Sequence, residues 1–327
     1  MSFASEVKNE LARAMPEKPC CRLAELAGFI RIGGAVGLVG GGRLTLTLST
    51  ENPAVARHYK KLLRECFGTR ASLFVGEHAN FRKKGHLYEL CMDDSADAEH
   101  ILRETGIFLT RDGYGCIDAG ICDEFLKTKC CRKAYLRGAF LGAGTLNDPE
   151  KGYHLEIVCG SETLAADVRR LFNSFTDIHA KVAFRRGRFA VYLKNAGAIA
   201  DILNILGAHG QLLAFENIRI VKELRNRTNR INNCDNANLD KSLRAAEAQS
   251  RAIAGLCDGA GPDALPEKLR AAALLRLANP EASLAELGEM SDPPITKSSM
   301  HRRLKAAAAV AAKRGAGGTN ERGSPLR

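Results

Sequence analysis

The chain has 327 residues, with 48 lysines and arginines against 37 aspartates and glutamates, which gives a formal net charge of +11. This length suffices for two or three domains, and the basic surplus is typical of proteins that bind nucleic acid, although an ordinary soluble protein can also be basic. No apolar run approaches a membrane span and the first residues lack the pattern of a secretory signal, so we expect a cytoplasmic protein with no membrane partner.

Residues 1–19 are predicted to hold one N-terminal helix. Ser2 is a typical N-cap, and Phe3, Val7 and Leu11 fall on one helical face. The segment is therefore expected to be amphipathic.

A motif then occurs twice, with a separation of 110 residues. Cys20-Cys21-Arg22-x-Ala24-x-Leu26-x-Gly28 recurs as Cys130-Cys131-Arg132-x-Ala134-x-Leu136-x-Gly138, with six identities. A duplication of this size indicates two copies of one domain-sized unit that pack about a pseudo-twofold axis. Glycines at the end of each apolar helix let two backbones approach closely, so we expect the two helices to meet at the axis.

Each copy is predicted to have the element order αββαββα. In the first copy, Leu44, Leu46 and Leu48 alternate with polar residues in a strand, and Asn52-Pro53 begins a helix. We therefore predict an α+β fold in which residues 20–221 form a duplicated domain, with halves at about 20–110 and 130–210.

The eleven cysteines show no disulfide framework and no Cys-x-x-Cys. Adjacent cysteines on a helix point about 100° apart, which is a poor start for a metal site. Because both pairs recur with the repeat, we expect small residues in equivalent packing positions, with a zinc or redox role as the alternative. No metal ion or cofactor is predicted.

A hairpin over Lys181–Lys194 is predicted to have one apolar and one cationic face. Val182 and Phe184 belong to the apolar face, which must pack on helices. The other face carries Lys181, Arg185, Arg188, Tyr192 and Lys194. Together with the basic turn Arg82-Lys83-Lys84 of the first copy, basic faces from both halves would make a saddle on duplex DNA. The alternatives are an ordinary solvated sheet face and a protein-docking platform.

Residues 222–262 are predicted to form a helical linker rich in arginine and asparagine. Arg225, Arg227 and Arg230 supply charge. An amide stripe at helical spacing consists of Asn226, Asn229, Asn233 and Asn236. We expect contact with DNA or between domains here, with helix capping by asparagine as the alternative.

Residues 263–312 are predicted to form three helices with a helix-turn-helix plan. Pro266 begins the first helix, Ser283 opens the second with a capping box, and Thr296 caps the third. Residues 313–327, with their glycine, serine and proline, are predicted to be disordered.

Charge is concentrated on the third of these helices, where six basic residues and no acidic residue lie between Lys297 and Arg314. Its buried stripe is expected to contain Met300, Leu304 and Ala308. Such a helix can place its N-terminal side chains in the major groove. The predicted DNA-binding residues are Ser283, Thr296, Lys297, Ser298, Ser299, His301, Arg302, Arg303 and Lys305. A small helical packing domain is the alternative, and His301 could equally be an ordinary surface histidine.

The glycine-rich runs Leu26–Ala35 and Leu136–Thr145 resemble the signature helix of LAGLIDADG homing endonucleases. The resemblance implies two halves joined along paired helices, each ending in an acidic residue that holds divalent metals. Those positions are Gly33 and Ala143 here, and neither supplies a carboxylate for a hard cation. We therefore expect a scaffold that binds nucleic acid without cutting it, and no catalytic residues.

The chain as a whole resembles the WhiA family of bacterial regulators. The matching segments are Ser2–Leu11, Asn229–Asn238 and Leu284–Ser298. The resemblance implies a degenerate LAGLIDADG-like domain, a C-terminal helix-turn-helix, and double-stranded DNA as the partner. It implies a transcriptional regulator linked to sporulation in some Gram-positive bacteria, and to cell division and chromosome segregation in others, associated with the nucleoid.

Three other functions stay open. A residual nuclease would need replacement carboxylates such as Asp148 and Glu150, which more simply build a turn. An adaptor would dock a sigma factor or another protein through the repeat domain. A nucleoid-associated protein would organise the chromosome. The expected oligomeric state is a monomer with an internal pseudo-dimer.

Overall fold

The computed structural model describes residues 2–40, 43–77, 86–92 and 94–317. The chain divides into two compact units, Met1–Glu223 and Leu224–Arg327. The division falls inside the predicted linker, and the domain boundaries proposed from the sequence stay predictions. Within the described residues, no helix is long and apolar enough to cross a membrane.

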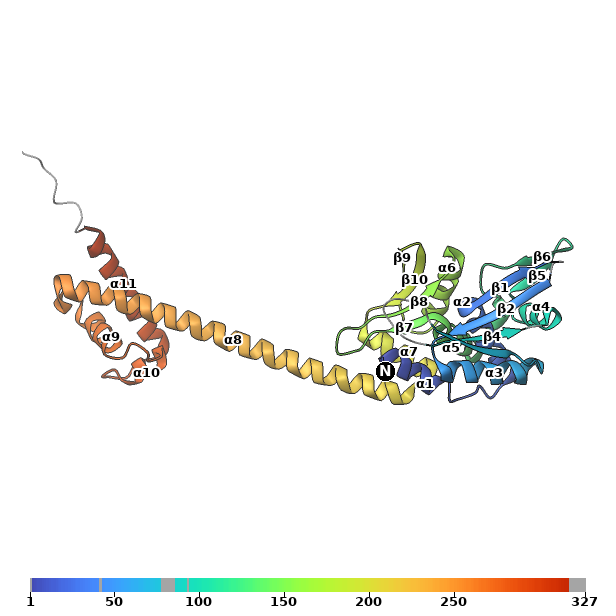
Figure 1. Ribbon diagram of the computed structural model, residues 1–327. Helices are drawn as coiled ribbons and strands as arrows, with labels where there is room; N and C mark the ends of the chain where they lie inside the picture. Colours follow the sequence, from blue (N-terminus) through green and yellow to red (C-terminus); the bar gives the residue numbers. More distant parts are fainter. Residues whose placement is uncertain (1, 41–42, 78–85, 93, 318–327) are drawn as a thin grey trace, which may run out of the picture. The chain divides into compact units, whose positions relative to one another are not determined.

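The first unit contains two copies of one αββαββα motif (Figure 1). The first copy consists of α2 (Pro19–Gly33), β1 (Gly34–Val39), β2 (Arg43–Thr50), α3 (Pro53–Phe67), β3 (Ser72–Glu77), β4 (His86–Met92) and α4 (Ser95–Glu104). The second consists of α5 (Lys129–Ala143), β7 (Gly144–Leu146), β8 (Leu155–Cys159), α6 (Glu162–Asn173), β9 (Lys181–Arg185), β10 (Arg188–Leu193) and α7 (Ala196–Leu206). The two antiparallel sheets have the matching orders β1-β2-β4-β3 and β7-β8-β10-β9. The predicted duplication and fold class are confirmed.

Other elements of this unit lie before and between the copies. Helix α1 (Phe3–Leu11) begins at Ser2, whose side chain accepts a hydrogen bond from the Ser5 N–H at 3.2 Å, and its Val7 is buried in the core. The sequence did not predict the hairpin of β5 (Phe108–Arg111) and β6 (Tyr114–Ile117), or the short 3-10 helix η1 (Asp123–Leu126), which connect the two copies.

Helices α2 and α5 lie side by side where the two copies meet. Gly28 of α2 lies against the carbonyl oxygen of Tyr135, and Gly138 of α5 lies against that of Glu25. Neither position has room for a Cβ atom. The predicted close approach of the two backbones is therefore present, and each glycine of the repeated motif is required by its partner helix.

Replacing Gly138 with alanine is expected to lower the free energy of unfolding by about 1–3 kcal/mol, because the added methyl group forces α2 and α5 apart. Urea denaturation followed by circular dichroism measures this change. Gly160→Ala is the matched control, since a Cβ at Gly160 meets no atom within 4 Å. Equal losses in the two variants would contradict the close approach.

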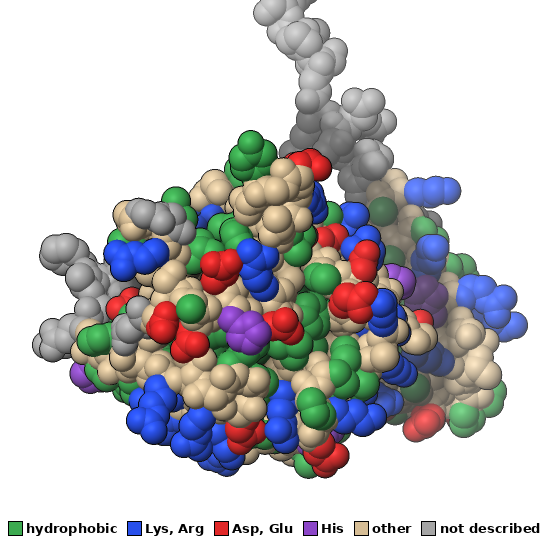
Figure 2. All heavy atoms as spheres, turned by 90° about the vertical axis from the view of Figure 1, so that its right-hand side faces the viewer, with side chains coloured by type: hydrophobic (Ala, Val, Ile, Leu, Met, Phe, Trp, Pro, Cys, Tyr) green, Lys and Arg blue, Asp and Glu red, His purple; other side chains and the backbone are tan. Residues whose placement is uncertain are grey.

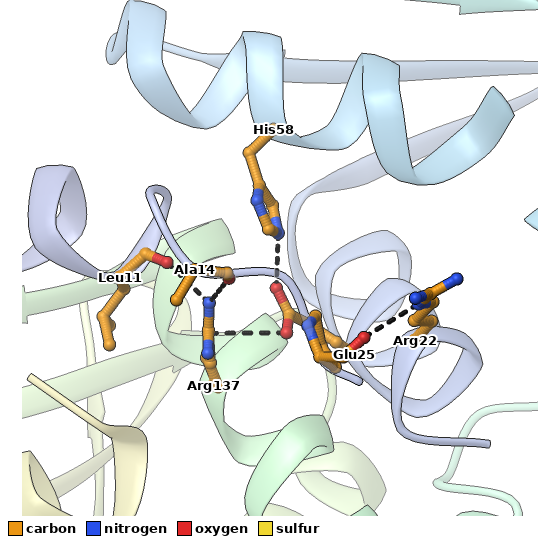
Figure 3. Close-up of polar contacts among 7 residues, drawn as sticks. Leu11, Ala14, Arg22, Glu25, His58 and Arg137 are labelled. Atoms are coloured by element: carbon orange, nitrogen blue, oxygen red, sulfur yellow. Dashed lines mark hydrogen bonds and ion pairs between the residues drawn. The ribbon is translucent and has the colours of Figure 1, made fainter. Parts of the chain in front are cut away.

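A buried polar network crosses the contact between α2 and α5 (Figure 3). Glu25 on α2 is fully buried; its Oε1 lies 2.7 Å from Nε2 of His58 on α3, and its Oε2 lies 3.4 Å from Nε of Arg137 on α5. Arg137 also donates hydrogen bonds to the backbone carbonyl oxygens of Leu11, the last residue of α1, and of Ala14, in the segment that follows. One carboxylate thus connects both copies and the N-terminal segment.

Helix α8 (His209–Ala260) contributes residues to both units. It is one continuous helix, which includes residues 222–260 of the predicted helical linker. Phe215 is buried in the core of the first unit, and Ile253 is buried in the core of the second.

The second unit also contains η2 (Pro262–Ala264), α9 (Glu267–Ala278), α10 (Leu284–Glu289) and α11 (Lys297–Gly317). Its core is built from Ile253, Leu256, Leu265, Ala272, Ala273, Leu287, Met300, Leu304, Ala307 and Ala311. Helix α11 continues to Gly317, where the sequence predicted disorder from residue 313 onward. The rest of that predicted tail, residues 318–327, lies outside the described residues.

Candidate nucleic-acid interface

Helix α11 is amphipathic, as the sequence predicted, with a buried apolar stripe and an exposed side. It begins after Thr296, whose Oγ1 accepts a hydrogen bond from the Ser299 N–H at 3.3 Å. Its buried stripe contains Met300, Leu304, Ala307 and Ala311. The prediction of Ala308 in this stripe is wrong, because at about 100° per residue Ala307 lies roughly 20° from Met300 and Ala308 roughly 80°.

The opposite side of α11 is exposed and cationic. Its exposed side chains include Lys297, Ser298, His301, Arg302 and Lys305. Arg302 and Lys305 are three residues apart and are therefore neighbours on the helix surface. Ser299 and Arg303 are half-buried on the flank of this face, so their side chains reach less freely outward than the sequence predicted.

The segment before α11 is fixed by short-range contacts. Ser283 forms the predicted capping box: its Oγ accepts from the Glu286 N–H at 3.3 Å, and its own N–H donates to Oε2 of Glu286 at 2.7 Å. This backbone donation lowers the pKa of Glu286. The N–H of Ile295 donates to the carbonyl oxygen of Gly288 at 2.9 Å, and Gly288 has no room for a Cβ against Ile295. The turn thus holds the start of α11 close to α10.

The basic face predicted for the hairpin Lys181–Lys194 is present on strands β9 and β10. Lys181 pairs with Tyr192 and Arg185 pairs with Arg188 across β9 and β10. The Arg185 guanidinium lies 6.0 Å from the centre of the Tyr192 ring, and Nζ of Lys194 lies 5.5 Å from it. We call these five side chains the basic sheet face.

One detail of this hairpin differs from the prediction of an apolar face packed on helices. Phe184 is 64% exposed and contacts Phe189 instead, with ring centres 4.8 Å apart. The strand ends at a turn beyond the core, so its last apolar side chain has no helix to cover it. Glu156 lies next to Tyr192 on β8 and accepts a hydrogen bond from Nε2 of His154 at 2.9 Å, which places one acid beside the cations.

The described strands of the first sheet, β1-β2-β4-β3, do not carry a cationic face like the basic sheet face of the second copy. Within the described residues, its four strands carry one cation, Arg43, and the face away from the core presents mainly hydroxyl and apolar groups. Phe74 on this face is 56% exposed. The expectation of basic faces on both halves is therefore wrong for the described strands, and the predicted basic turn Arg82-Lys83-Lys84 lies outside the described residues.

A basic stripe on α3 was missed in the sequence. Arg57, Lys60, Lys61 and Arg64 are exposed and follow the i, i+3, i+4, i+7 spacing of one helical face. Arg70 lies close to them. Lysine and arginine side chains gather along the lower edge of this face of the first unit in Figure 2, where Figure 1 places α3. The spacing was available in the sequence and could have revealed the stripe.

The arginines predicted on the linker are exposed on α8 but do not form one cluster. Arg227 and Arg230 lie about 60° apart around the helix, whereas Arg225 lies well over 90° from both. Arg225 shares the side of the predicted amide stripe, whose four asparagines are all exposed.

The C-terminal ends of α2 and α5 lie close together. A Cβ at Gly33 would be 3.2 Å from Cα of Gly142. Ala143, Lys8 and Glu51 are among the residues lining an open cavity of about 660 Å³ at the end of α5. Burial lowers the pKa of Lys8 to about 8, while the charge of Glu51 opposes this shift. An ammonium group and one carboxylate therefore lie near Ala143.

At the opposite ends of the same helices, the structure changes the interpretation of the cysteines. The ligand atoms of Cys20, Cys21, Cys130 and Cys131 all lie within 4.8 Å of one another. Each pair alone diverges on its helix, as the sequence indicated, but the two helices together bring four thiols to one place. The divergence of each pair on its own helix therefore does not exclude a metal site here.

Comparisons with known proteins agree with this architecture. Family models match residues 19–108 (WhiA N-terminal LAGLIDADG-like domain), 132–225 (WhiA LAGLIDADG-like domain) and 228–311 (WhiA C-terminal HTH domain). The "Probable cell division protein WhiA" of Alkaliphilus metalliredigens is 44% identical over 93% of this chain and 96% of that protein. The protein of the same name from Thermoanaerobacter sp. is 42% identical over 93% of this chain and 95% of that protein.

Among solved structures, full-length DUF199/WhiA from Thermotoga maritima matches with a TM-score of 0.55 and 25% identity, over 96% of this chain and 99% of that chain. The matches together cover both units, from the duplicated motif to the C-terminal helices. The chain therefore belongs to the WhiA family.

Proposed function

We propose that the protein is a sequence-specific DNA-binding regulator of transcription without nuclease activity. The observation that supports this most is the exposed face of α11, where Ser298, Arg302 and Lys305 lie opposite the buried apolar stripe. No acidic residue follows Lys297 along this helix, so the face attracts phosphates. Arginine and lysine can also donate hydrogen bonds to guanine in the major groove, which makes α11 the element that reads sequence.

The basic sheet face has the second role in this proposal, binding the phosphate backbone. Arg185 and Arg188 are direct cross-strand neighbours, and like charges in that position repel each other. A polyanion placed across them relieves this repulsion. Contacts of this kind add affinity without sequence information and weaken as salt concentration rises.

The absence of nuclease activity rests on the ends of α2 and α5. Gly33 and Ala143, which take the places of the metal-holding acids in the resemblance to homing endonucleases, carry no carboxylate. Gly33 also lies too close to Gly142 for a longer side chain to fit without a shift of the backbone. Lys8 lines the cavity at Ala143, where its charge opposes the binding of a divalent cation.

Incubating supercoiled plasmid with the protein and magnesium tests the proposed absence of nuclease activity. We expect the plasmid to stay intact over many hours. Nicking by the wild-type protein that is lost in Glu51→Gln or in Asp148→Asn would overturn the assignment, because those carboxylates would then be holding a catalytic metal.

The relatives are named for cell division. This name supports a role for this chain in regulating division, and the family resemblance adds sporulation and chromosome segregation as further processes. We place its action at the nucleoid, as a monomer whose two halves act as an internal pseudo-dimer.

A second candidate function is that of an adaptor, favoured by the first sheet. Its described strands carry the single cation Arg43 and expose Phe74, a composition that suits a protein partner better than a phosphate backbone. A sigma factor docked there would leave the helix-turn-helix as the main DNA contact. Loss of regulation in Phe74→Ser without loss of DNA binding would favour the adaptor.

Selection from a pool of random duplexes tests the main proposal directly. The full-length protein should enrich one short sequence motif over successive rounds. Enrichment of no motif, with binding that depends only on salt, would contradict sequence-specific recognition and favour a chromosome-organising protein.

A further inference from the structure

The four-cysteine cluster occupies one end of the helix pair that joins the two copies. Cys20 and Cys21 are the second and third residues of α2, and Cys130 and Cys131 are the second and third residues of α5. Their ligand atoms all lie within 4.8 Å of one another. In a tetrahedral zinc site with Zn–S bonds of about 2.3 Å, neighbouring sulfur atoms are about 3.8 Å apart. Changes of side-chain rotamer and about an ångström of closure would reach that geometry.

The arrangement follows the internal symmetry of the chain. The thiol of Cys21 interacts with that of Cys130, and the thiol of Cys131 interacts with that of Cys20. The duplication relates Cys20 to Cys130 and Cys21 to Cys131, so the two cross-helix contacts are equivalent by the pseudo-twofold axis. Two diverging pairs related in this way define the corners of a tetrahedron, which neither helix could supply alone.

The surroundings favour the anionic form of Cys130 but not of the two buried sulfurs, because burial raises the pKa of Cys21 and of Cys131. Both helix N-termini point at the cluster, and neither first turn contains an acidic residue. The Thr128 hydroxyl lies 3.3 Å from Sγ of Cys130 and, with the Cys21 thiol, lowers the pKa of Cys130 to about 7. Burial acts in the opposite direction on Cys21 and raises its pKa well above the usual range. A buried thiol of this kind ionises when a cation neutralises it.

The cluster is also accessible. Cys20 is exposed and Cys130 is half-buried, whereas Cys21 and Cys131 are buried against the core. A metal ion can therefore enter from solvent and complete its coordination with the two inner sulfurs. All eleven cysteines lie within the described residues and none forms a disulfide there.

We propose that Cys20, Cys21, Cys130 and Cys131 bind one zinc ion as a structural tetrathiolate site. Four Zn–S bonds form, and the protons of the thiols leave to solvent; no atom is oxidised or reduced. Because two ligands come from each copy, the ion joins the halves of the duplicated domain beside the axis. This site is independent of the DNA-binding proposal.

Cobalt provides the probe for the test, since Co²⁺ takes the same geometry and its thiolate complexes absorb visible and near-ultraviolet light. Full-length protein, purified under reductant and stripped with a chelator, is titrated with Co²⁺ and then with Zn²⁺. We expect one Co²⁺ per chain with the bands of tetrahedral thiolate ligation, displaced by Zn²⁺. Zinc should also protect four thiols from a thiol reagent.

The variant Cys20→Ser/Cys130→Ser removes one ligand from each helix at the two accessible positions, which leaves the buried packing intact. It should lower cobalt affinity by more than about 100-fold, a larger loss than changes outside the ligand shell cause. Cys116→Ser/Cys234→Ser is the matched control and should bind cobalt as the wild type does. Zinc should raise the melting temperature of the control and not that of the ligand variant.

Several results would overturn the proposal. These are wild-type protein without stoichiometric cobalt binding, cobalt bands that persist in Cys20→Ser/Cys130→Ser, and a disulfide between α2 and α5 in protein isolated under reductant. If the ligand variant does not fold, the thiol-protection measurement on wild-type protein decides alone: fewer than four protected thiols contradicts the site.

Discussion

Replacing both Arg302 and Lys305 with alanine is expected to weaken binding to a selected DNA sequence by at least about 30-fold. Each side chain is exposed on α11 and supplies hydrogen bonds to base edges or phosphates, at about 1–3 kcal/mol for a residue that reads a base. The fold of the second unit should be unaffected, because its core is built from the opposite face of the helix.

Fluorescence anisotropy with the selected duplex and a scrambled duplex, at several salt concentrations, measures this effect. Lys268→Ala, an exposed lysine on α9, is the matched control and should bind as the wild type does. Arg188→Ala should weaken binding to both duplexes about equally and reduce the salt dependence, since its predicted contact is to phosphate. A larger loss of sequence preference in Arg188→Ala than in Arg302→Ala/Lys305→Ala would reverse the two assigned roles.

Arg137→Ala is expected to lower the free energy of unfolding of the first unit by about 3–5 kcal/mol. The substitution leaves the carboxylate of Glu25 buried without its cation, and it removes hydrogen bonds to the carbonyl oxygens of Leu11 and Ala14. Both the helix pair and the segment after α1 lose a shared contact.

Urea denaturation of the full chain, with hydrogen exchange followed at α2 and α5, assigns the loss to this unit. Arg219→Ala is the matched control, because Arg219 forms a partly exposed ion pair with Glu216 at 2.9 Å and should contribute about 0–1 kcal/mol. Similar losses in the two variants would show that the buried network stabilises no more than a surface pair.

The duplication could be predicted because the same short motif occurs twice in the sequence. The repeated motif identifies two equivalent helices, and their glycines indicate a close contact, which is where Gly28 and Gly138 meet the opposite backbone. The start of α11 was equally local, since Ser283 and Thr296 cap the two helices on either side of the turn. Signals of this kind depend on residues within a few positions of each other.

What the sequence did not reveal depends on contacts between distant residues. Glu25 and Arg137 are paired across the two copies, and neither position signals its partner. The clustering of the four cysteines could not be predicted for the same reason, since the geometry of one helix does not show where a second helix lies beside it. Phe184 was assigned to a packed face because alternation predicts the side of a strand, not whether a helix covers its end.

Occupancy of the chromosome by the tagged protein, measured beside its Arg302→Ala/Lys305→Ala variant, tests the central claim most directly. A sequence-specific regulator that reads DNA through α11 predicts discrete promoter peaks that disappear in the variant. Peaks that persist in the variant, or diffuse coverage by the wild-type protein, would contradict recognition by this helix.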